Sequence, residues 1–474
     1  MILVQNHRQR LNGNNLIAFV FILLLSASCG ILNPEKGGKS APPDSVPTQA
    51  EKTVSIYNPR TGQYEEVPAS EVIIDTLSLR DITEISIPPI TESDLSISGE
   101  KKSSYHFSLM MPFNAIKYQN ISNPVDPRGR RFIQYYAGAR LAVDDLMQSG
   151  IRIDMHVYDT EESSSKVRSL LNDPNVKSSD VIIGPYRTEN IEAVSAFSKE
   201  NQIVCVSPWI PGFEVPGNNP QLLQMTPGLE AHADAIFEHI EANYPRTVVY
   251  IVSRNSEREM NRLTMFKDAY QRIFSEPDSL KELMINDNTS DLQNTDWLSI
   301  FEKPERAIFV IPYYSRGDEG FVNSVLRKIH AERLEKEIIV FGMPQWMSFR
   351  NMNYDYLEAL QAHLSTISYT DRYHHKYKNF SSRFFDRYGI VAEDPAFQGY
   401  DLISFLGKAI SENGTMFLPK LKNELSSEIN LGFDIRPVYE NRSPDQSDLQ
   451  VPKYFENRGI RILKFYNQDF QILK

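Results

Sequence analysis

Residues 105–474 alternate short apolar runs with amphipathic stretches, and this alternation constrains the fold more than any other feature of the sequence. Strands are expected at 106–111, 151–158, 181–183, 203–206, 247–252, 283–286, 307–311, 338–341 and 364–370. Helices are expected at 132–148, 161–171, 188–200, 230–242, 257–273, 321–334, 377–388 and 398–411. Apolar strands between helices are typical of βαβ units, whose sheets are covered on both faces. The pattern predicts an α/β protein with mostly parallel sheets.

The alternation of apolar runs and amphipathic stretches is interrupted between residues 221 and 228 and then resumes, which predicts two doubly wound, Rossmann-like units in succession. The chain ends with a hairpin-like pair of strands at 461–465 and 470–473. With 474 residues, of which 41% are hydrophobic, the chain is long enough to build two cores.

The N-terminus has the layout of an export signal. His7, Arg8 and Arg10 precede a ten-residue apolar run at 16–25. A membrane-spanning helix needs about 20 apolar residues, so this run is too short to be one. The run is followed by Ser-Ala-Ser and then Cys29.

Small residues directly before Cys29 resemble the lipobox of bacterial lipoproteins, although Ser26 stands where a leucine is usual. The resemblance implies that residues 1–28 are a signal peptide and that Cys29 carries acyl chains such as palmitate. Several acyl chains on one residue hold a protein stably on a membrane. No acidic cluster follows Cys29, so we expect the bacterial cell envelope, at the outer membrane facing the periplasm. In the alternative, plain secretion, Cys29 is incidental.

Residues 29–102 read as the lipidated N-terminus followed by a flexible tether. This segment holds eight prolines among Ser, Thr, Glu and Lys, and it lacks a sustained helical stripe of apolar residues. Two stretches, 54–67 and 72–90, alternate apolar and polar residues, so edge strands are the alternative there.

The net charge of −11 argues against nucleic acid as a partner, because the chain has no basic excess to neutralise phosphates. The only two cysteines, Cys29 and Cys205, can form neither a disulfide framework nor a multi-thiolate zinc site. Cys205 lies in an apolar strand and is expected to be a buried small hydrophobe.

Catalytic and metal-binding motifs are absent from the sequence. It contains no GxSxG, HExxH, GxxxxGK[ST] or CxxC. His374 and His375 are adjacent, and His232 and His239 are two helical turns apart, so neither pair is expected to chelate one ion. We expect all four at the surface, and we expect a protein that is not an enzyme and holds no metal or cofactor.

Six segments of the chain resemble those of a known family. These segments are HVYDT at 156–160, DVIIGPYRTEN at 180–190, IVCVSPW at 203–209, FGMPQW at 341–346, QGYDLISFLGKAI at 398–410 and RGIRILKFYNQDFQIL at 458–473. In order and spacing they resemble the type I periplasmic binding proteins, the solute-binding proteins of branched-chain amino acid ABC transporters. They also resemble the related lobes of outer-membrane lipoproteins that activate peptidoglycan synthases.

The resemblance implies two lobes with a cleft between them. We expect one lobe from residues 103–227 plus 366–415 and the other from 228–365 plus 416–474. In open parallel sheets the ligand crevice lies at the carboxyl ends of the strands. The candidate residues there are Asn114, Asp159, Tyr186, Arg187, Thr188, Ser207, Trp209, Asn255, Tyr313, Arg316, Gln345 and Trp346.

Arg187 and Arg316 would hold a carboxylate, and the four aromatic candidates would enclose a ring or a sugar. The alternative is that these residues cap helices and fill the lobe interface. Amino-acid-binding relatives typically have small residues where this chain has Trp209, and an acid after the strand that ends at Ile311. Because an unpaired ammonium group is costly in a closed site, free amino acids are not the expected ligands.

Two functions follow from these observations. The first is a membrane-anchored periplasmic lipoprotein of the solute-binding type, which recognises a small molecule or peptide in the interlobe cleft. The alternative is an envelope lipoprotein that docks on and regulates a protein partner, such as a peptidoglycan synthase or another outer-membrane assembly.

Overall fold

The computed structural model describes residues 53–58, 63–68, 99–118, 125–211, 218–254, 256–274, 280–285, 292, 295–302, 305–421, 426–439 and 451–473. The chain divides into two compact units, residues 1–89 and 90–474. The segment expected to be a signal peptide (1–28), Cys29 and the stretch 72–90 lie outside the described residues. No helix within the described part is both long and apolar enough to cross a bilayer.

The first unit contains a β-hairpin in the segment expected to be a tether. Strands β1 (Thr53–Asn58) and β2 (Gln63–Pro68) pair antiparallel, with Thr53 opposite Pro68 and Asn58 opposite Gln63. Within 54–67 the structure therefore agrees with the strand alternative rather than with a featureless spacer.

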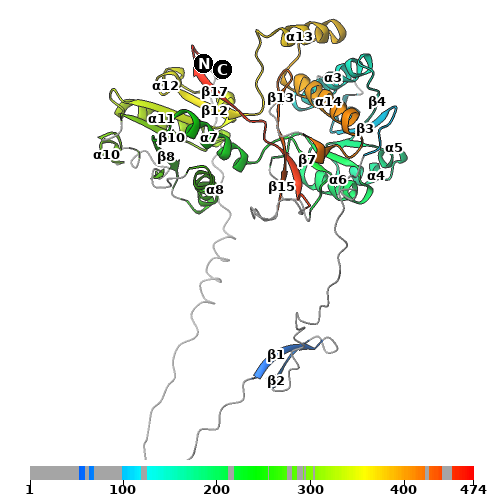
Figure 1. The fold of residues 1–474 in the computed structure, drawn as a ribbon, viewed down its shortest axis with the longest axis horizontal. Coiled ribbons are helices and arrows are strands. Elements are labelled where there is room, and N and C mark those ends of the chain that lie inside the picture. Colours follow the sequence, from blue (N-terminus) through cyan, green and yellow to red (C-terminus); the bar gives the residue numbers. More distant parts are fainter. Residues whose placement is uncertain are drawn as a thin grey trace, which may run out of the picture. The chain divides into compact units, whose positions relative to one another are not determined.

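The first lobe of the second unit is built on a seven-stranded sheet (Figure 1). Its strands are β3 (Tyr105–Met111), β4 (Ile153–Asp159), β5 (Val181–Ile183), β6 (Val204–Ser207), β7 (Leu222–Gln224), β15 (Ile435–Val438) and β16 (Tyr454–Asn457), in the order β15-β16-β7-β6-β5-β3-β4. All neighbours are parallel except β15 and β16. β4 forms one edge of this sheet.

Helices cover both faces of this sheet. They are α3 (Pro127–Gln148), α4 (Ser164–Leu170), α5 (Pro174–Lys177), α6 (Thr188–Asn201), α13 (His375–Tyr388) and α14 (Asp394–Asn413), with 3-10 turns η1 (Ala115–Tyr118) and η5 (Leu418–Lys420) and a short pair β13 (Ser426–Ser427) and β14 (Gly432–Phe433). Alternate strand residues divide between the faces: Leu109 packs with α3 and α14, and Met110 packs with α4, α5 and α6. α3 begins five residues before its predicted start, because Asp126 caps it and Pro127 occupies its first turn.

The second lobe repeats the plan (Figure 1). Its strands are β8 (Val248–Ser253), β9 (Leu280–Met284), β10 (Arg306–Val310), β11 (Glu337–Gly342), β12 (Ala362–Thr366), β17 (Arg461–Tyr466) and β18 (Asp469–Ile472), in the order β18-β17-β12-β11-β10-β8-β9. Its helices are α7 (Leu229–Asn243), α8 (Glu257–Ile273), α10 (Trp297–Glu302), α11 (Glu319–Glu332) and α12 (Tyr354–Ala359), with η3 (Arg316–Asp318) and η4 (Pro344–Ser348). Strands β8 to β12 are parallel to one another, whereas β17 runs antiparallel to both of its neighbours, β12 and β18.

The two-lobed, doubly wound α/β fold predicted from the sequence is confirmed, but one segment belongs to the other lobe. We expected all of 416–474 in the second lobe, whereas β15 and β16 extend the first sheet. The reason is packing: Phe455 pairs with Leu223 of β7, and Ile435 and Phe455 are buried in the core of the first lobe. Only β17 and β18 join the second sheet.

The chain passes between the lobes three times, after β7, after β12 and after β16. The buried Asn457 side chain ties these crossings together: its Nδ2 donates to the carbonyls of Met225 (3.3 Å) and Gly432 (2.9 Å), and its Oδ1 accepts from the Gly459 N–H (3.0 Å). The Gly432 N–H in turn donates to the carbonyl of Ile367, on the second crossing.

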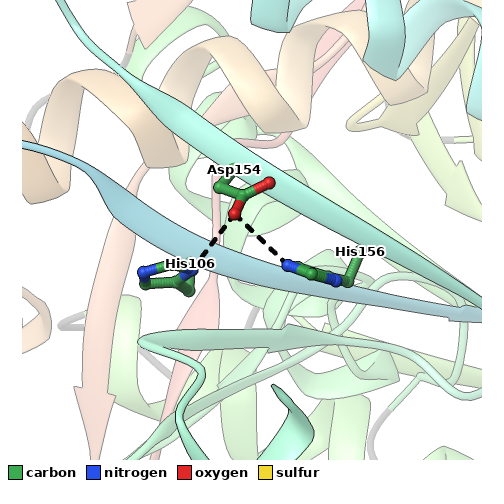
Figure 2. A group of neighbouring side chains, drawn as sticks. All are labelled: His106, Asp154 and His156. Carbon is green, nitrogen blue, oxygen red and sulfur yellow. Dashed lines mark hydrogen bonds and ion pairs between the residues drawn. The ribbon is translucent and has the colours of Figure 1, made fainter.

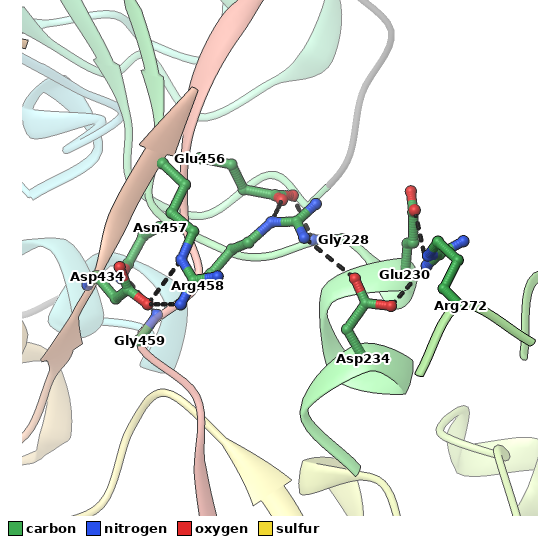
Figure 3. A network of polar contacts seen from close by, with 10 residues as sticks. Gly228, Glu230, Asp234, Arg272, Asp434, Glu456, Asn457, Arg458 and Gly459 are labelled. Carbon is green, nitrogen blue, oxygen red and sulfur yellow. Dashed lines mark hydrogen bonds and ion pairs between the residues drawn. The ribbon is translucent and has the colours of Figure 1, made fainter. Parts of the chain in front are cut away.

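Charged groups brace the same region (Figure 3). Glu456 accepts from the Gly228 N–H at 2.9 Å, and the Arg458 guanidinium bridges Glu456 (3.0 Å) and Asp234 of α7 (3.1 Å). The first and third crossings are therefore joined to the first turns of α7 by charge-assisted hydrogen bonds.

Helices α3 and α14 approach so closely that only glycine fits at the contact. A Cβ on Gly138 would lie 1.8 Å from the Ala396 carbonyl oxygen, and a Cβ on Gly399 would lie 2.1 Å from that of Tyr135. This contact fixes α14, whose first half reaches the cleft described below.

We expect Gly399→Ala to lower the free energy of unfolding by about 1–3 kcal/mol or more, because the added methyl forces the two helices apart. Gly320→Ala is the matched control: Gly320 lies in α11 with no atom near its Cβ position, so that substitution should be neutral or stabilise by up to about 1 kcal/mol. Chemical denaturation of both variants checks this, and equal stabilities would contradict the close-packing argument.

Candidate functional site

A cleft of about 590 Å³ opens between the two lobes, next to the crossings. The first lobe contributes residues of α3, α14 and the loop after β6; the crossings contribute Gly228 and Ile367; and the second lobe contributes residues of α7, α8 and the loops after β10 and β11. These loops follow the carboxyl ends of parallel strands, where open α/β sheets bind their ligands.

Most of the cleft wall is apolar. Its apolar lining residues are Pro208, Trp209, Pro211, Met225, Pro227, Leu229, Met265, Met343, Pro344, Ile367, Leu402 and Leu431. Three methionine and three leucine side chains, three of the six from each lobe, line this space, and such flexible groups adapt to the shape of an apolar ligand.

Arg131 is the one charged side chain among the described residues that line the cleft, apart from the histidine treated below. Its guanidinium carbon lies 6.0 Å from the ring centroids of both Trp209 and Tyr186, at the edge of cation–π range. No Asp or Glu is among the described lining residues.

Trp209 is held by a cluster of rings. Its centroid lies 4.9 Å from that of Tyr135, 5.4 Å from that of Phe132 and 5.9 Å from that of Tyr186, all in edge-to-face geometry. Edge-to-face packing of this kind orients a ring rigidly. Trp209 therefore presents a fixed wall to the cleft instead of filling it.

Uncharged polar groups also line the cleft. Gln398 donates to Ser368 Oγ at 3.5 Å, and Ser368 Oγ donates to Asn430 Oδ1 at 2.7 Å. The buried Tyr135 hydroxyl has no hydrogen-bond partner within the described residues, and burial raises its pKa, so it stays a neutral donor. These groups supply a few directional contacts within an apolar wall.

His232 lines the cleft from α7 and is buried, so the expectation of a surface histidine is wrong at this position. Its Nδ1 lies 2.9 Å from Ser365 Oγ. Burial lowers the pKa of His232 to about 4, and the imidazole is neutral at pH 7.

The sequence-predicted site residues divide into three groups. Trp209 and Gln345 line the cleft, and Tyr186 lies directly behind Trp209. Tyr313 and Trp346 are buried beneath the second-lobe wall: the Trp346 indole donates to the Tyr313 carbonyl at 2.8 Å, and the Tyr313 hydroxyl accepts from the Arg254 N–H at 2.7 Å.

The remaining candidates lie outside the cleft lining. Arg187 is exposed and pairs with Glu162 at 2.7 Å, and Thr188 begins α6 at the surface. Asp159 accepts hydrogen bonds from the N–H groups of Asn114 and Ala115. Ser207 is buried, and its hydroxyl has no partner in the described part of the chain. Arg316 is exposed in η3. Asn255 lies outside the described residues.

Sequence reasoning missed Arg131, Tyr135, His232, Ser368 and Gln398. It looked for site residues only in the loops after strands, whereas these lie in helices and in a crossing. The break in the alternation at 221–228, which marks the first crossing, was a signal only for His232, which follows it closely; the other four are brought to the cleft by tertiary packing.

Comparison with known proteins identifies the family. The model of the receptor family ligand-binding region matches residues 134–431, more than half of the chain. The chain belongs to this family. The resemblance to type I periplasmic binding proteins is thereby confirmed. A search of curated proteins found no match.

Solved structures share the fold at low identity. A structure described as a branched-chain amino acid ABC transporter protein from Rhodospirillum rubrum is 11% identical, with 78% of this chain and 100% of that chain covered and a TM-score of 0.55. LpoA from Haemophilus influenzae is 10% identical, with 82% of this chain and 61% of that chain covered and a TM-score of 0.52. Its C-domain, described as a regulator of PBP1A, gives a TM-score of 0.50 at 10% identity, with 78% and 100% covered.

We expect His232→Asn to change how stability depends on pH. The unfolded imidazole takes up a proton near pH 6.5, whereas the folded one does so only near pH 4, so wild-type stability should fall by about 3 kcal/mol as the pH drops through this window. The variant should lose that slope in urea titrations at several pH values. Equal slopes in the two proteins would show that His232 is not held neutral by burial.

Proposed function

We propose that the protein is a lipid-anchored periplasmic binding protein that takes a small, largely apolar ligand with an anionic group into the interlobe cleft. The observation that carries this proposal is the cleft itself: an apolar space of about 590 Å³ between the lobes, with Arg131 as its charged lining group. The role is recognition rather than catalysis, in keeping with a family of ligand-binding regions.

The ligand chemistry follows from the charges on the wall. The Arg131 guanidinium has no carboxylate partner among the described residues, so a carboxylate or phosphate of the ligand would complete its hydrogen bonds. A ligand ammonium group would meet no lining acid there, and leaving it unpaired in a closed apolar site costs several kcal/mol. Apolar acids and anionic peptides without a free amine at the site fit better than zwitterionic amino acids.

We expect an apolar carboxylic acid of suitable size to raise the melting temperature of the full-length protein by a few degrees when present at about one hundred times its Kd. The screen would set such acids beside amino acids, neutral apolar compounds, sugars, nucleosides and muropeptides. Arg131→Gln should weaken binding of the acid by roughly 10-fold to 100-fold, because a hydrogen bond to a charged group is lost.

Two comparisons make this test specific. Arg316→Gln removes an exposed arginine outside the cleft and should leave binding unchanged. Trp209→Ala should abolish binding of both the acid and its neutral analogue. If no compound in the panel shifts the wild-type melting temperature, the cleft is not a small-molecule site, and crosslinking in cells would then test the alternative of a docked protein partner.

We also propose that Cys29 carries the lipid that holds the protein on the periplasmic face of the outer membrane, which is the meaning of the Ser-Ala-Ser-Cys sequence after the apolar run. Cys29→Ser should move the protein from the membrane to the soluble fraction and abolish labelling by radioactive palmitate. Cys205→Ser is the matched control, because that thiol is buried in β6 and burial raises its pKa to about 12. Membrane retention of the Cys29→Ser variant would contradict the anchor.

A further inference from the structure

Two histidines and an aspartate meet at one edge of the first-lobe sheet, away from the cleft (Figure 2). His106 is the second residue of β3, and Asp154 and His156 lie on β4, the edge strand. The register pairs His106 with Asp154 and Ser108 with His156. Because side chains alternate along strands, all three project from the same face.

The two imidazoles converge on a single carboxylate oxygen. His106 Nδ1 lies 3.4 Å from Asp154 Oδ2, and His156 Nε2 lies 3.3 Å from the same atom (Figure 2). Both distances exceed the usual range of about 2.7–3.2 Å for an N–H···O hydrogen bond. Two ligand atoms that each lie about 2.1 Å from a tetrahedral ion are about 3.4 Å apart, which matches the observed spacing.

The donor set selects the kind of ion. All three ligand atoms lie within 4.8 Å of one another, and the side chains are about one third to one half exposed, so small rotations would close them around a cation. Two imidazoles and one carboxylate suit Zn²⁺ and its neighbours Co²⁺, Ni²⁺ and Cu²⁺, whereas Ca²⁺ and Mg²⁺ require oxygen ligands.

We propose that His106, Asp154 and His156 form a binding site for a zinc-class divalent cation, with three protein ligands and the remaining coordination positions open to solvent. The open positions follow from the exposure of the three side chains, which are about one third to one half accessible to solvent.

This site is separate from the ligand cleft. His106 lies near the amino end of β3, and the cleft lies beyond the carboxyl ends of the strands, so roughly 16 Å of strand separates them. The cation would cross-link β3 to β4 and so stabilise the edge strand. A cation site here goes beyond the proposed function, and either proposal can fail without the other.

The start of β3 is already held in place beside the cluster. Asp180 accepts from the His106 N–H at 2.9 Å with one oxygen and pairs with Lys102 at 2.8 Å through the other. The His106 backbone is therefore fixed independently of its side chain, and a substitution of the imidazole should leave the sheet intact.

The test uses full-length protein without a histidine tag, freed of metal with a chelator and titrated with ZnCl₂ in a calorimeter. We expect one equivalent of Zn²⁺ to bind and the melting temperature to rise by a few degrees at saturation. His156→Ala and Asp154→Asn should each lose this binding phase. Excess Ca²⁺ or Mg²⁺ should not compete with it.

His375→Ala is the matched control, because His375 is an exposed histidine on α13, outside the cluster. It should retain the one-equivalent phase. Replacement of Zn²⁺ by Co²⁺ adds a spectroscopic readout: a visible d–d absorption band in the wild type that is absent from His156→Ala. The proposal is overturned if the wild type binds no Zn²⁺, or if His156→Ala and Asp154→Asn bind it as the wild type does.

Discussion

The side-chain amide of Asn457 is the interaction on which the two-lobed arrangement depends. It is fully buried and makes hydrogen bonds to the first crossing, at Met225, and to the third, at Gly459. Through Gly432 the network reaches the second crossing at Ile367. The backbones approach so closely that a Cβ on Gly432 would lie 2.2 Å from the Gly459 carbonyl oxygen. Buried backbone polar groups need hydrogen-bond partners, and here the three crossings supply them to one another. The crossings are thus held together as one hinge.

A buried carboxylate supports the same hinge from the first lobe. Asp401 of α14 is fully buried and accepts from the N–H groups of residues 429–431, the segment that bonds to the second crossing. Burial raises the pKa of Asp401 to about 7, against the pull of these donors. Because Leu402 and Leu431 line the cleft, a ligand bound there would touch side chains adjacent to this anchor.

The regular helices and strands could be predicted from the sequence, because the apolar residues that they bury recur with a regular spacing along the chain. β5 and α8 begin and end at the predicted residues. β7, β15 and β16 could not be predicted, since each is short and, unlike the wholly apolar β5, mixes apolar and polar residues, and since their place depends on pairing distant in sequence. The site was harder for the same reason. Trp209 and Gln345 follow strands and were found, whereas Arg131 and Gln398 reach the cleft from helices whose relative placement only the tertiary packing determines. His106 likewise meets Asp154 only through strand register.

The filled floor of the second lobe explains why the cleft is apolar. Trp346 lies so close to Gly342 that a Cβ there would be 2.6 Å from the indole, and the indole N–H is already bonded to the Tyr313 carbonyl. Both aromatic groups expected to contact a ligand are instead buried beneath the wall and bonded to main-chain groups, Trp346 to the Tyr313 carbonyl and the Tyr313 hydroxyl to the Arg254 N–H. Methionine and proline side chains are left to face the opposite lobe. In the function we propose, recognition of the ligand's anionic group falls to the first lobe, where Arg131 lies beside the ring cluster of Trp209. Closure of the second lobe would exclude water from that guanidinium and so strengthen its electrostatic interaction with a bound anion. The same apolar surface would disfavour a cation that has no partner.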